Sequence, residues 1–494
     1  MKGSSQITDQ PEIPFEFSFK KFFIPFTTLK AVHWIVFIGI IVYFNVLFNG
    51  FVWDDFTYMI SNPVIHVFNL FSLFGVNNQF NGPGYYRPIP AVYISLLWNL
   101  FGTTAFFYHA IQISLQTACA CLVFFFLKRF FSVHFSFFLS LIFLVHPIQT
   151  ESVAYISGTQ NNLFFLFGMI AILIGLKEKL YTKQLLLMSL FLLLSIFSKE
   201  TGFLFALMIL LYQFFYSRQN LAFTTGYLIG TFAIYFFVRF SYAQDFLVKN
   251  ATIPIALIPM PERLLNIPAI FFYYLQTFFY PENLSIDQQW IVVSTTFNDF
   301  YLPLIFDSLF IVFLLGFGIF IYKKKRKLLN LYLFFTVWFF IGIALVLQVF
   351  PLDATVSDRW FYFSIVGILG IFGILLHSIT IKNTYVVAGL AVVCIGFLSI
   401  RTMVRNTNYV DQMTLFSHDA AVARNGFDLE NQLGAMYYQE NNIAESRKHF
   451  QRAAAEMPCL NSASNLEIVD QQIGDSKAVG KDKRILAKCA GKSF

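Results

Sequence analysis

Long apolar runs alternate with short polar segments along this chain between residues 31 and 400. Most runs approach the ~20 residues that an α-helix needs to cross a bilayer, and they are too continuous for the alternating strands of a membrane barrel. The pattern therefore predicts an all-α polytopic membrane protein. Eleven spans are predicted, at Ala31–Asn49, Ala105–Leu127, Val133–His146, Asn161–Leu176, Gln184–Ser198, Thr201–Tyr216, Asn220–Phe240, Leu302–Tyr322, Leu328–Phe350, Phe361–His377 and Thr384–Ile400.

Two further apolar stretches, Pro88–Gly102 and Leu264–Tyr280, are shorter or richer in aromatic residues. We expect them to form interfacial or re-entrant helices on the outer face. The composition agrees with a membrane protein: 57% of the 494 residues are hydrophobic and 12% are charged, against roughly 25% charged residues in an average globular protein. It excludes a soluble globular enzyme, a disordered chain and a disulfide-stabilised scaffold.

The basic residues indicate how the chain is oriented. With the N-terminus inside, most lysines and arginines between the spans, including the run Lys323–Lys327, fall on the inner side, as the positive-inside rule requires. Residues 1–30 then form a cytoplasmic segment without a cleavable signal, and an odd number of spans places the C-terminal tail outside. The net charge of +7 therefore reflects topology, and no nucleic-acid partner is expected. The acidic residues gather in the outer loops, which is where we expect the chemistry.

After Arg401 the composition changes to that of a soluble segment, which predicts an extracytoplasmic helical domain over residues 402–494. Leu429–Pro458 has the pattern of one tetratricopeptide repeat, and Asn408–Arg424 is predicted to be an amphipathic helix in front of it. One repeat cannot bury its own apolar face, so it should pack on that helix or on the outer loops. A generic helical hairpin is the alternative. The residues near the repeat's expected offsets are Leu433, Gly434, Tyr437, Phe450, Ala453 and Pro458, with Ser446 in the small-residue position.

Such a tail is a candidate for binding protein partners. An oxidising compartment would allow its two cysteines, Cys459 and Cys489, to form a disulfide, although two cysteines leave that pairing open. The other cysteines, Cys119, Cys121 and Cys394, lie in predicted spans, where we expect them to be packing residues.

The first outer loop, at about residues 49–104, opens with two adjacent carboxylates, Asp54 and Asp55. Partial desolvation and mutual repulsion should raise the pKa of at least one of them, which suits a general base acting on an acceptor hydroxyl. A solvated acidic pair is the alternative. Arg87, further along the loop, either binds an anionic headgroup, pairs with the aspartates or is an ordinary interfacial arginine.

Four more polar residues lie where predicted spans meet the outer side. His146 and Glu151 flank Pro147 at the end of the third span, and they face the outer loop or simply cap the helix. Lys199 and Glu200 form the turn between the fifth and sixth spans, where ionisable groups at membrane depth are functional candidates. Their alternative role is a mutual ion pair that stabilises the turn.

The tenth span opens from outside with Asp358, Arg359 and Tyr362. Arg359 can reach a phosphate at headgroup level, or it forms a local pair with Asp358. Taken together, these motifs bring carboxylates, arginines, a lysine and a histidine to one face of the membrane. That combination favours a reaction between a lipid phosphate and an extracytoplasmic acceptor.

The ordered motifs resemble those of TMTC proteins, which are transmembrane O-mannosyltransferases with tetratricopeptide repeats in the GT-C superfamily. The motifs are WDD, YRP, HPIQTESVA, SKETG, YYLQTFFYPENLSID and DRWFYFSIVG, and the resemblance runs from about Asn49 to Pro458. It implies a GT-C fold with about eleven transmembrane helices. It also implies inverting transfer of a sugar, typically mannose, from a polyprenyl-phosphate carrier to a protein hydroxyl.

By this resemblance, Asp54 or Asp55 matches the catalytic carboxylate, and Arg87, Lys199 and Arg359 are candidates for binding the carrier phosphate. The remaining candidates would shape the substrate cavity. Two sites depart from the family: Ser157–Gln160 replaces a basic residue, and Asp358 stands where Glu is frequent. The single short repeat indicates a bacterial relative in the plasma membrane, using an undecaprenyl-type carrier and an acceptor protein or glycan. The cavity-shaping candidates are His146, Glu151, Glu200, Asp358 and Tyr362.

An activated phosphate ester leaves readily, so no metal is strictly required, although a divalent cation bridging Asp54 and Asp55 is an open alternative. Two other functions compete with transfer. A lipid or glycan flippase would place ionisable groups near the bilayer midplane and show inverted repeats. A non-catalytic scaffold that presents the tail to partners would not need the charges of the outer loops.

Overall fold

The computed structural model describes residues 26–75, 80, 85–242, 253–379, 384–457 and 461–490. In this part of the chain the regular structure is helical, and strand pairing is limited to an isolated bridge between Gln288 and Val356. The all-helical architecture expected from the hydropathy pattern is therefore confirmed for the described residues. Most of the predicted N-terminal segment, Pro458 and Cys459 lie outside the described residues.

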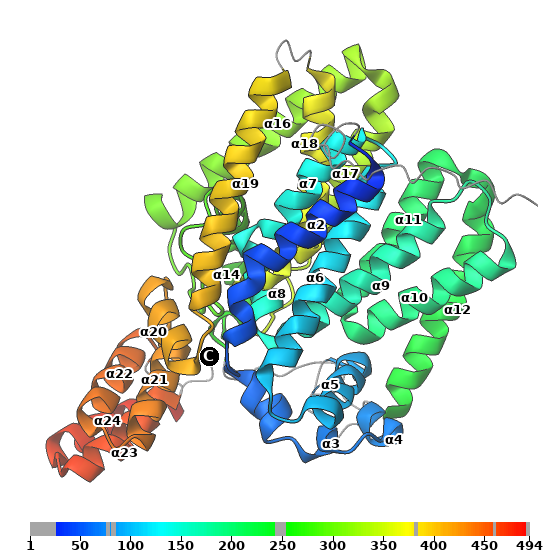
Figure 1. Ribbon diagram of the computed structural model, residues 1–494. Helices are drawn as coiled ribbons and strands as arrows, with labels where there is room; N and C mark the ends of the chain where they lie inside the picture. The colour runs from blue at the N-terminus through cyan, green and yellow to red at the C-terminus, as the bar shows by residue number, and fades with distance from the viewer. Residues whose placement is uncertain are drawn as a thin grey trace, which may run out of the picture.

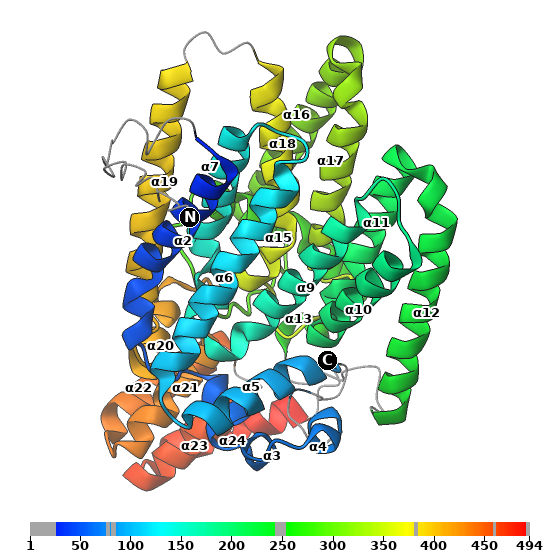
Figure 2. The same cartoon turned by 45° about the vertical axis from the view of Figure 1, so that its right-hand side comes forward.

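Long or apolar helices form the main bundle in Figures 1 and 2. Seven of the described helices are long and apolar enough to cross a membrane, and an eighth arises if α7 and the bent segment after it form one span. Three more predicted spans fall on shorter apolar helices, α10, α11 and α18. The helices are α2 (Thr28–Tyr43), α6 (Ala105–Leu127), α7 (Val133–Val145), α9 (Thr159–Gly175), α10 (Thr182–Ser198), α11 (Phe203–Tyr216), α12 (Arg218–Tyr242), α16 (Leu302–Lys324), α17 (Leu329–Ala344), α18 (Ser364–Ser378) and α19 (Thr384–Thr407).

Small residues let neighbouring helices of the bundle approach closely. A Cβ atom at Gly367 of α18 would lie 2.4 Å from the backbone nitrogen of Phe339 in α17, and one at Gly168 of α9 would overlap the ring of Phe205 in α11. Membrane helices gain little from burying apolar surface against each other, so their association depends on such close packing. These glycines therefore help to bring together the helices that carry the candidate site.

Helix α17 is shorter than predicted, because the span expected over Leu328–Phe350 ends at Ala344. Gln348 has a positive φ of 59° and its side chain ties the following loop together. Its amide nitrogen donates to the carbonyls of Ala354 and Thr355 at 2.7 and 3.0 Å, and its amide oxygen accepts from the backbone of Leu352 at 2.9 Å. Apolar residues after Ala344 therefore form a loop that hydropathy alone assigned to a helix.

Several short helices, α3, α4 and α5 among them, lie at the end of the bundle that also carries the C-terminal helices in Figures 1 and 2. The turn between α16 and α17, with its basic run Lys323–Lys327, lies at the opposite end of the bundle. The two apolar stretches predicted as interfacial helices form α5 and α15. The short helices are α3 (Pro63–His66), α4 (Leu70–Phe74), α5 (Pro88–Phe101), α8 (Thr150–Ala154), α13 (Pro254–Leu257), α14 (Met260–Leu264) and α15 (Ile267–Phe279).

The C-terminal segment contains five helices after α19, which itself continues to Thr407, beyond the predicted domain boundary at residue 401. Helices α21 and α22 form a hairpin in which Gly434 faces the ring of Phe450, where a Cβ atom would come within 2.6 Å. The Ser446 hydroxyl donates to the carbonyl of Gly434 at 2.8 Å. The predicted helical hairpin is thus present, but α23 and α24 were not predicted. The helices are α20 (Gln412–Val422), α21 (Phe427–Gln439), α22 (Ile443–Glu456), α23 (Asn461–Ile473) and α24 (Ser476–Ala490).

A buried ion pair holds these helices to the bundle. The Arg405 guanidinium, near the end of α19, donates two hydrogen bonds to the carboxylate of Asp419 in α20, at 2.5 and 2.9 Å. The same carboxylate accepts from the backbone nitrogen of Ile286 at 2.7 Å. A second tie joins the first loop to the tail, because the backbone nitrogen of Gly50 donates to the carbonyl of Val410 at 2.8 Å. The tail therefore packs on the loops at this end, as expected.

Candidate functional site

All three cations that the sequence selected for phosphate binding line one cavity of about 610 Å³. We call it the basic cavity, defined by Arg87, Lys199 and Arg359. Its remaining wall is largely apolar and comes from the start of α11, the end of α17 and the loop after it. Glu200 and Tyr362, two of the residues predicted to shape the cavity, also line it. The apolar residues of the wall include Phe203, Leu204, Leu345, Val346, Val349, Phe350 and Leu352.

Arg87 precedes the first residue of α5 and is fixed by two side chains from other segments. Its Nε and one terminal nitrogen each lie 2.9 Å from the carboxylate of Glu200, and its other terminal nitrogen donates to Gln160 at 2.6 Å. Glu200 also accepts from the backbone nitrogen of Tyr86 at 3.0 Å. Arg87 therefore pairs with Glu200, and Lys199 does not form the predicted pair within the turn.

Arg359, which also lines the cavity, is held by Glu151. The guanidinium forms an ion pair with the Glu151 carboxylate, which also accepts from the backbone nitrogen of Arg359 at 3.0 Å. A second carboxylate, Asp353, lies 3.8 Å from the guanidinium with its side chain 68% exposed at the rim of the cavity. The local pair with Asp358 does not form, because the Tyr273 hydroxyl donates to the Asp358 carboxylate at 2.5 Å.

Lys199 differs from the two arginines because its ammonium contacts a neutral group. Its Nζ donates to the amide oxygen of Asn161 at 2.7 Å and lies 5.7 Å from the centroid of the Phe164 ring. No described carboxylate lies within ion-pair distance of this nitrogen. Burial, followed by repulsion from Arg87 and Arg359, lowers the pKa of Lys199 to about 7. An anionic ligand in the cavity would therefore stabilise the protonated form of Lys199.

Asp54, in the loop after the first helix, does not line the cavity itself, but it interacts electrostatically with Arg359 and Asp353, which do. Its Oδ2 accepts a hydrogen bond of 2.8 Å from the hydroxyl of Tyr155. Burial raises its pKa above the ordinary value, and the hydrogen bond from Tyr155 and the charge of Arg359 reduce that rise. The preceding residue, Trp53, has a positive φ of 50° and packs between the rings of Tyr155 and Phe416. The backbone at Trp53 thus turns Asp54 towards Tyr155.

Asp55 has a different environment from its neighbour. It is fully buried, and its Oδ1 accepts from the backbone nitrogen and the hydroxyl of Ser157 at 2.7 and 2.6 Å. Its Oδ2 accepts from the backbone nitrogen of Val52 at 3.0 Å. Burial raises the pKa of Asp55 to about 7 despite these bonds. Both oxygens are thus engaged by donors of the protein, and Asp55 fixes the loop that presents Asp54. A cation bridging the two carboxylates stays a prediction.

Apart from Tyr362, the remaining predicted residues do not line the basic cavity. His146 is buried, with Nε2 2.9 Å from the carbonyl of Phe278 and Nδ1 accepting from the backbone of Ile148 at 3.2 Å. Burial raises the pKa of Asp358 to about 7. The Tyr362 hydroxyl donates to Asn162 at 2.9 Å. His146, Glu151 and Asp358 therefore position other groups rather than line the cavity.

Several residues at this site were not predicted to take part in it. Tyr155, Asn161 and Gln160 each contact a predicted residue from a segment that is distant in the chain. Asp353 lies in the loop after α17 and also lines the cavity. Tyr155 directly follows the motif HPIQTESVA, so its neighbourhood was marked although its own role was not.

Two curated relatives are similar to part of the chain. A protein O-mannosyl-transferase of Caenorhabditis elegans is 31% identical over 179 residues, which is 33% of this chain and 25% of that protein. The human protein O-mannosyl-transferase TMTC3 is 27% identical over 158 residues, which is 31% of this chain and 17% of that protein. The chain resembles TMTC proteins over a third of its length. The matched segments thus span at most a quarter of these relatives.

No family model matches the chain, and no solved structure matches it. The similarity to the two relatives agrees with the resemblance found in the motifs. Several described helices have the length and composition of membrane spans, so the described chain fits a multi-pass integral membrane protein.

Proposed function

We propose that this chain is a membrane glycosyltransferase of the GT-C type that transfers a sugar, most simply mannose, from a polyprenyl phosphate to a hydroxyl of an acceptor protein. The observation that carries the proposal is the basic cavity, one of whose cations, Arg359, acts electrostatically on Asp54. It combines three cations with an extended apolar wall, which is the complementarity that a lipid phosphate requires. The names of the two similar proteins support mannose as the sugar and protein as the acceptor.

The topology in this proposal has eleven spans. They are the seven long helices, the bent pair formed by α7 and the segment after it, and the shorter apolar helices α10, α11 and α18. The N-terminus and the basic run Lys323–Lys327 lie inside, and the end with Asp54 and the C-terminal helices lies outside. Helices α21 and α22 are a tetratricopeptide repeat that binds protein partners. The membrane is a bacterial plasma membrane, and the carrier is of the undecaprenyl type. The basic run lies at the opposite end of the bundle from the C-terminal helices, which supports this orientation.

The chemistry assigns Asp54 as the general base. Its carboxylate takes the proton of the acceptor hydroxyl while the hydroxyl oxygen bonds to the anomeric carbon of the sugar. The bond between that carbon and the phosphate oxygen breaks, and its electron pair remains on the prenyl phosphate. Lys199, Arg87 and Arg359 stabilise the charge that develops there, as preorganised cations do in acyl and phosphoryl transfer. Tyr155 and Asp55 hold Asp54 in place.

The experiment that tests this function is transfer of labelled mannose from polyprenyl-phosphate mannose by the full chain in proteoliposomes, with a membrane extract of the host as acceptor. Label should appear in protein, and release of the label by β-elimination would identify a Ser or Thr linkage. A flippase would move the labelled lipid across the bilayer without forming labelled protein. Absence of labelled protein with every polyprenyl-phosphate sugar offered would overturn the proposal.

A further inference from the structure

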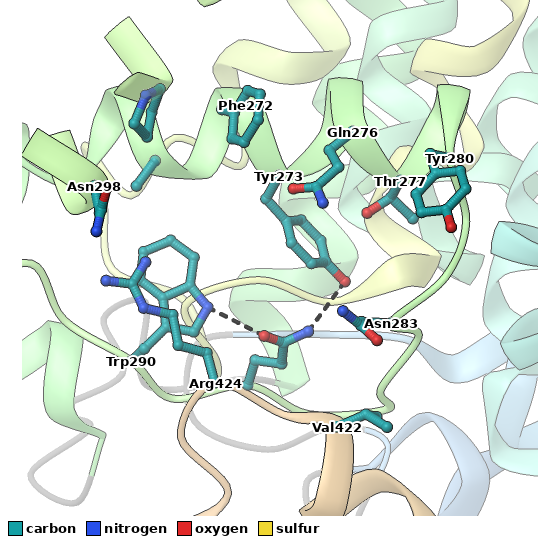
Figure 3. A pocket seen from close by; sticks show the side chains of 13 residues that line it. Phe272, Tyr273, Gln276, Thr277, Tyr280, Asn283, Trp290, Asn298, Val422 and Arg424 are labelled. Atoms are coloured by element: carbon teal, nitrogen blue, oxygen red, sulfur yellow. Dashed lines mark hydrogen bonds between the residues drawn. The ribbon is translucent and has the colours of Figure 1, made fainter. Parts of the chain in front are cut away.

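A second cavity, of about 260 Å³, lies outside the basic cavity and shares no lining residue with it. It is bounded by α15, by the segment that follows α15 and by the end of α20 with Arg424 (Figure 3). We call it the amide cavity, because Gln276, Asn283 and Asn298 line it from three different segments. The proposed transfer reaction uses none of these residues.

The amide groups of Gln276, Asn283 and Asn298 have no hydrogen-bond partner among the described residues, and their side chains are exposed to the cavity or to solvent. The ring of Tyr280, 56% exposed, and the hydroxyl of Thr277 lie on the same side of the cavity as Gln276 and Asn283 in Figure 3, whereas Asn298 lies across from them. The cavity therefore offers donors and acceptors in comparable numbers, next to an accessible aromatic ring.

The floor of the amide cavity is fixed by internal hydrogen bonds. The amide of Gln288 donates to the hydroxyl of Tyr273 at 3.3 Å, and its oxygen accepts from the indole nitrogen of Trp290 at 3.2 Å, as the dashed lines in Figure 3 show. Gln288 also forms the isolated backbone bridge to Val356. A ligand would thus meet a preorganised surface, which lowers the entropy cost of binding.

The charge at this cavity is already balanced. The Arg424 guanidinium lies 2.7 Å from the carboxylate of Asp299 and 4.7 Å from the centroid of the Trp290 ring, which it covers. An anionic ligand would have to displace Asp299. A neutral ligand that both donates and accepts hydrogen bonds matches the unpaired amides, because each amide presents an N–H₂ and a carbonyl.

We propose that the amide cavity binds a neutral carbohydrate. Sugar hydroxyls donate and accept as the amides do, and the C–H face of a sugar ring packs against aromatic side chains such as Tyr280 and Phe272. The volume is close to the lower end of ~300–1,000 Å³ found for small-molecule sites, so it suits a single sugar ring. Binding here does not depend on the proposed transfer reaction.

The test is calorimetric titration of the full chain in lipid nanodiscs with methyl glycosides of mannose, glucose and galactose and with N-acetylglucosamine. Nanodiscs are needed because glycoside detergents would compete for the site. We expect saturable binding of at least one sugar. Gln276→Ala and Asn298→Ala should each weaken it roughly five-fold, the effect of losing a neutral hydrogen bond.

Two control variants locate the binding. Gln451→Ala removes an exposed amide from α22, and Lys199→Met alters the basic cavity, so neither should change the affinity. Binding that Lys199→Met weakens and the two amide variants do not would overturn the proposal, because the sugar would then occupy the basic cavity. Absence of saturable binding for every sugar, or binding of a Ser/Thr-rich peptide in their place, would overturn it as well.

Discussion

Lys199 donates a 2.7 Å hydrogen bond to the neutral amide oxygen of Asn161, whereas Arg87 and Arg359, which line the same cavity, are each paired with a buried or half-buried glutamate. The two arginines are therefore fixed and compensated before any ligand arrives. Lys199 carries a charge that the described protein does not neutralise at ion-pair distance. Of the three cations, we therefore expect Lys199 to gain the most electrostatic stabilisation when a phosphate enters the cavity.

Replacing Lys199 by Met should lower kcat/KM for transfer from a polyprenyl-phosphate sugar about 100-fold, which is typical for the loss of one preorganised cation or donor. Thermal unfolding should be unchanged or shift upwards, because the variant removes a buried charge that has no carboxylate partner. Lys183→Met is a matched control, since Lys183 is exposed at the other end of α10. Unchanged transfer by Lys199→Met would contradict the assigned role.

The two adjacent aspartates should separate by their effects on stability. Asp55→Asn places an amide where three protein donors converge, and we expect it to destabilise the fold by about 3 kcal/mol. Asp54→Asn disturbs only the hydrogen bond from Tyr155 and should cost less than about 1 kcal/mol. Thermal unfolding of the two purified variants checks this prediction. Equal shifts in Tm would show that the two aspartates contribute equally to the stability of the fold.

The pH dependence of kcat/KM should be bell-shaped. Asp54 accepts a proton only when ionised, so activity falls as the pH drops through its pKa, which burial raises above the usual ~3.9. Lys199 binds phosphate only when protonated, so activity also falls as the pH rises through its pKa of about 7 in the empty cavity. Lys199→Arg keeps its charge at all accessible pH values. The alkaline limb should therefore move up by more than about 2 pH units in this variant, and an unmoved limb would exclude Lys199 as its origin.

The ion pair between Arg405 and Asp419 should hold the C-terminal helices to the bundle. Asp419→Ala leaves a buried guanidinium without its partner, which costs about 3–5 kcal/mol. We expect limited proteolysis to release residues beyond α19 far sooner than in the parent protein. Arg424→Ala breaks the exposed pair with Asp299 and should change the cleavage rate little. Equal cleavage of the two variants would show that the buried pair does not anchor the tail.

The hydropathy pattern predicted the helices well, because a span is a local property of the sequence. Helix α6 has the same limits as its predicted span, whereas α17 ends at Ala344 since the Gln348 side chain stabilises a loop that apolar residues alone could not reveal. The helices α23 and α24 were not predicted individually, although α24 has an amphipathic pattern as strong as that of the repeat's own helices.

The types of residue at the candidate site were predictable, but their pairing was not. Charges near the outer ends of spans singled out Arg87, Glu151, Glu200 and Arg359 from the sequence. The sequence suggested neighbours as partners, whereas the ion pairs join residues more than 100 positions apart. The different roles of Asp54 and Asp55 depend on Ser157 and Tyr155, whose contacts arise only when the helices pack.

The central claim is that Asp54 removes the proton of the acceptor while the basic cavity holds the carrier phosphate. The most direct test is single-turnover transfer by Asp54→Asn, together with the binding of polyprenyl phosphate to the same preparation. We predict that donor binding stays within about two-fold of the parent protein while transfer falls at least 100-fold, the lower end of the ~10²–10⁴-fold contribution expected for a general base. Transfer at the parental rate by a variant that binds the donor normally would contradict the account.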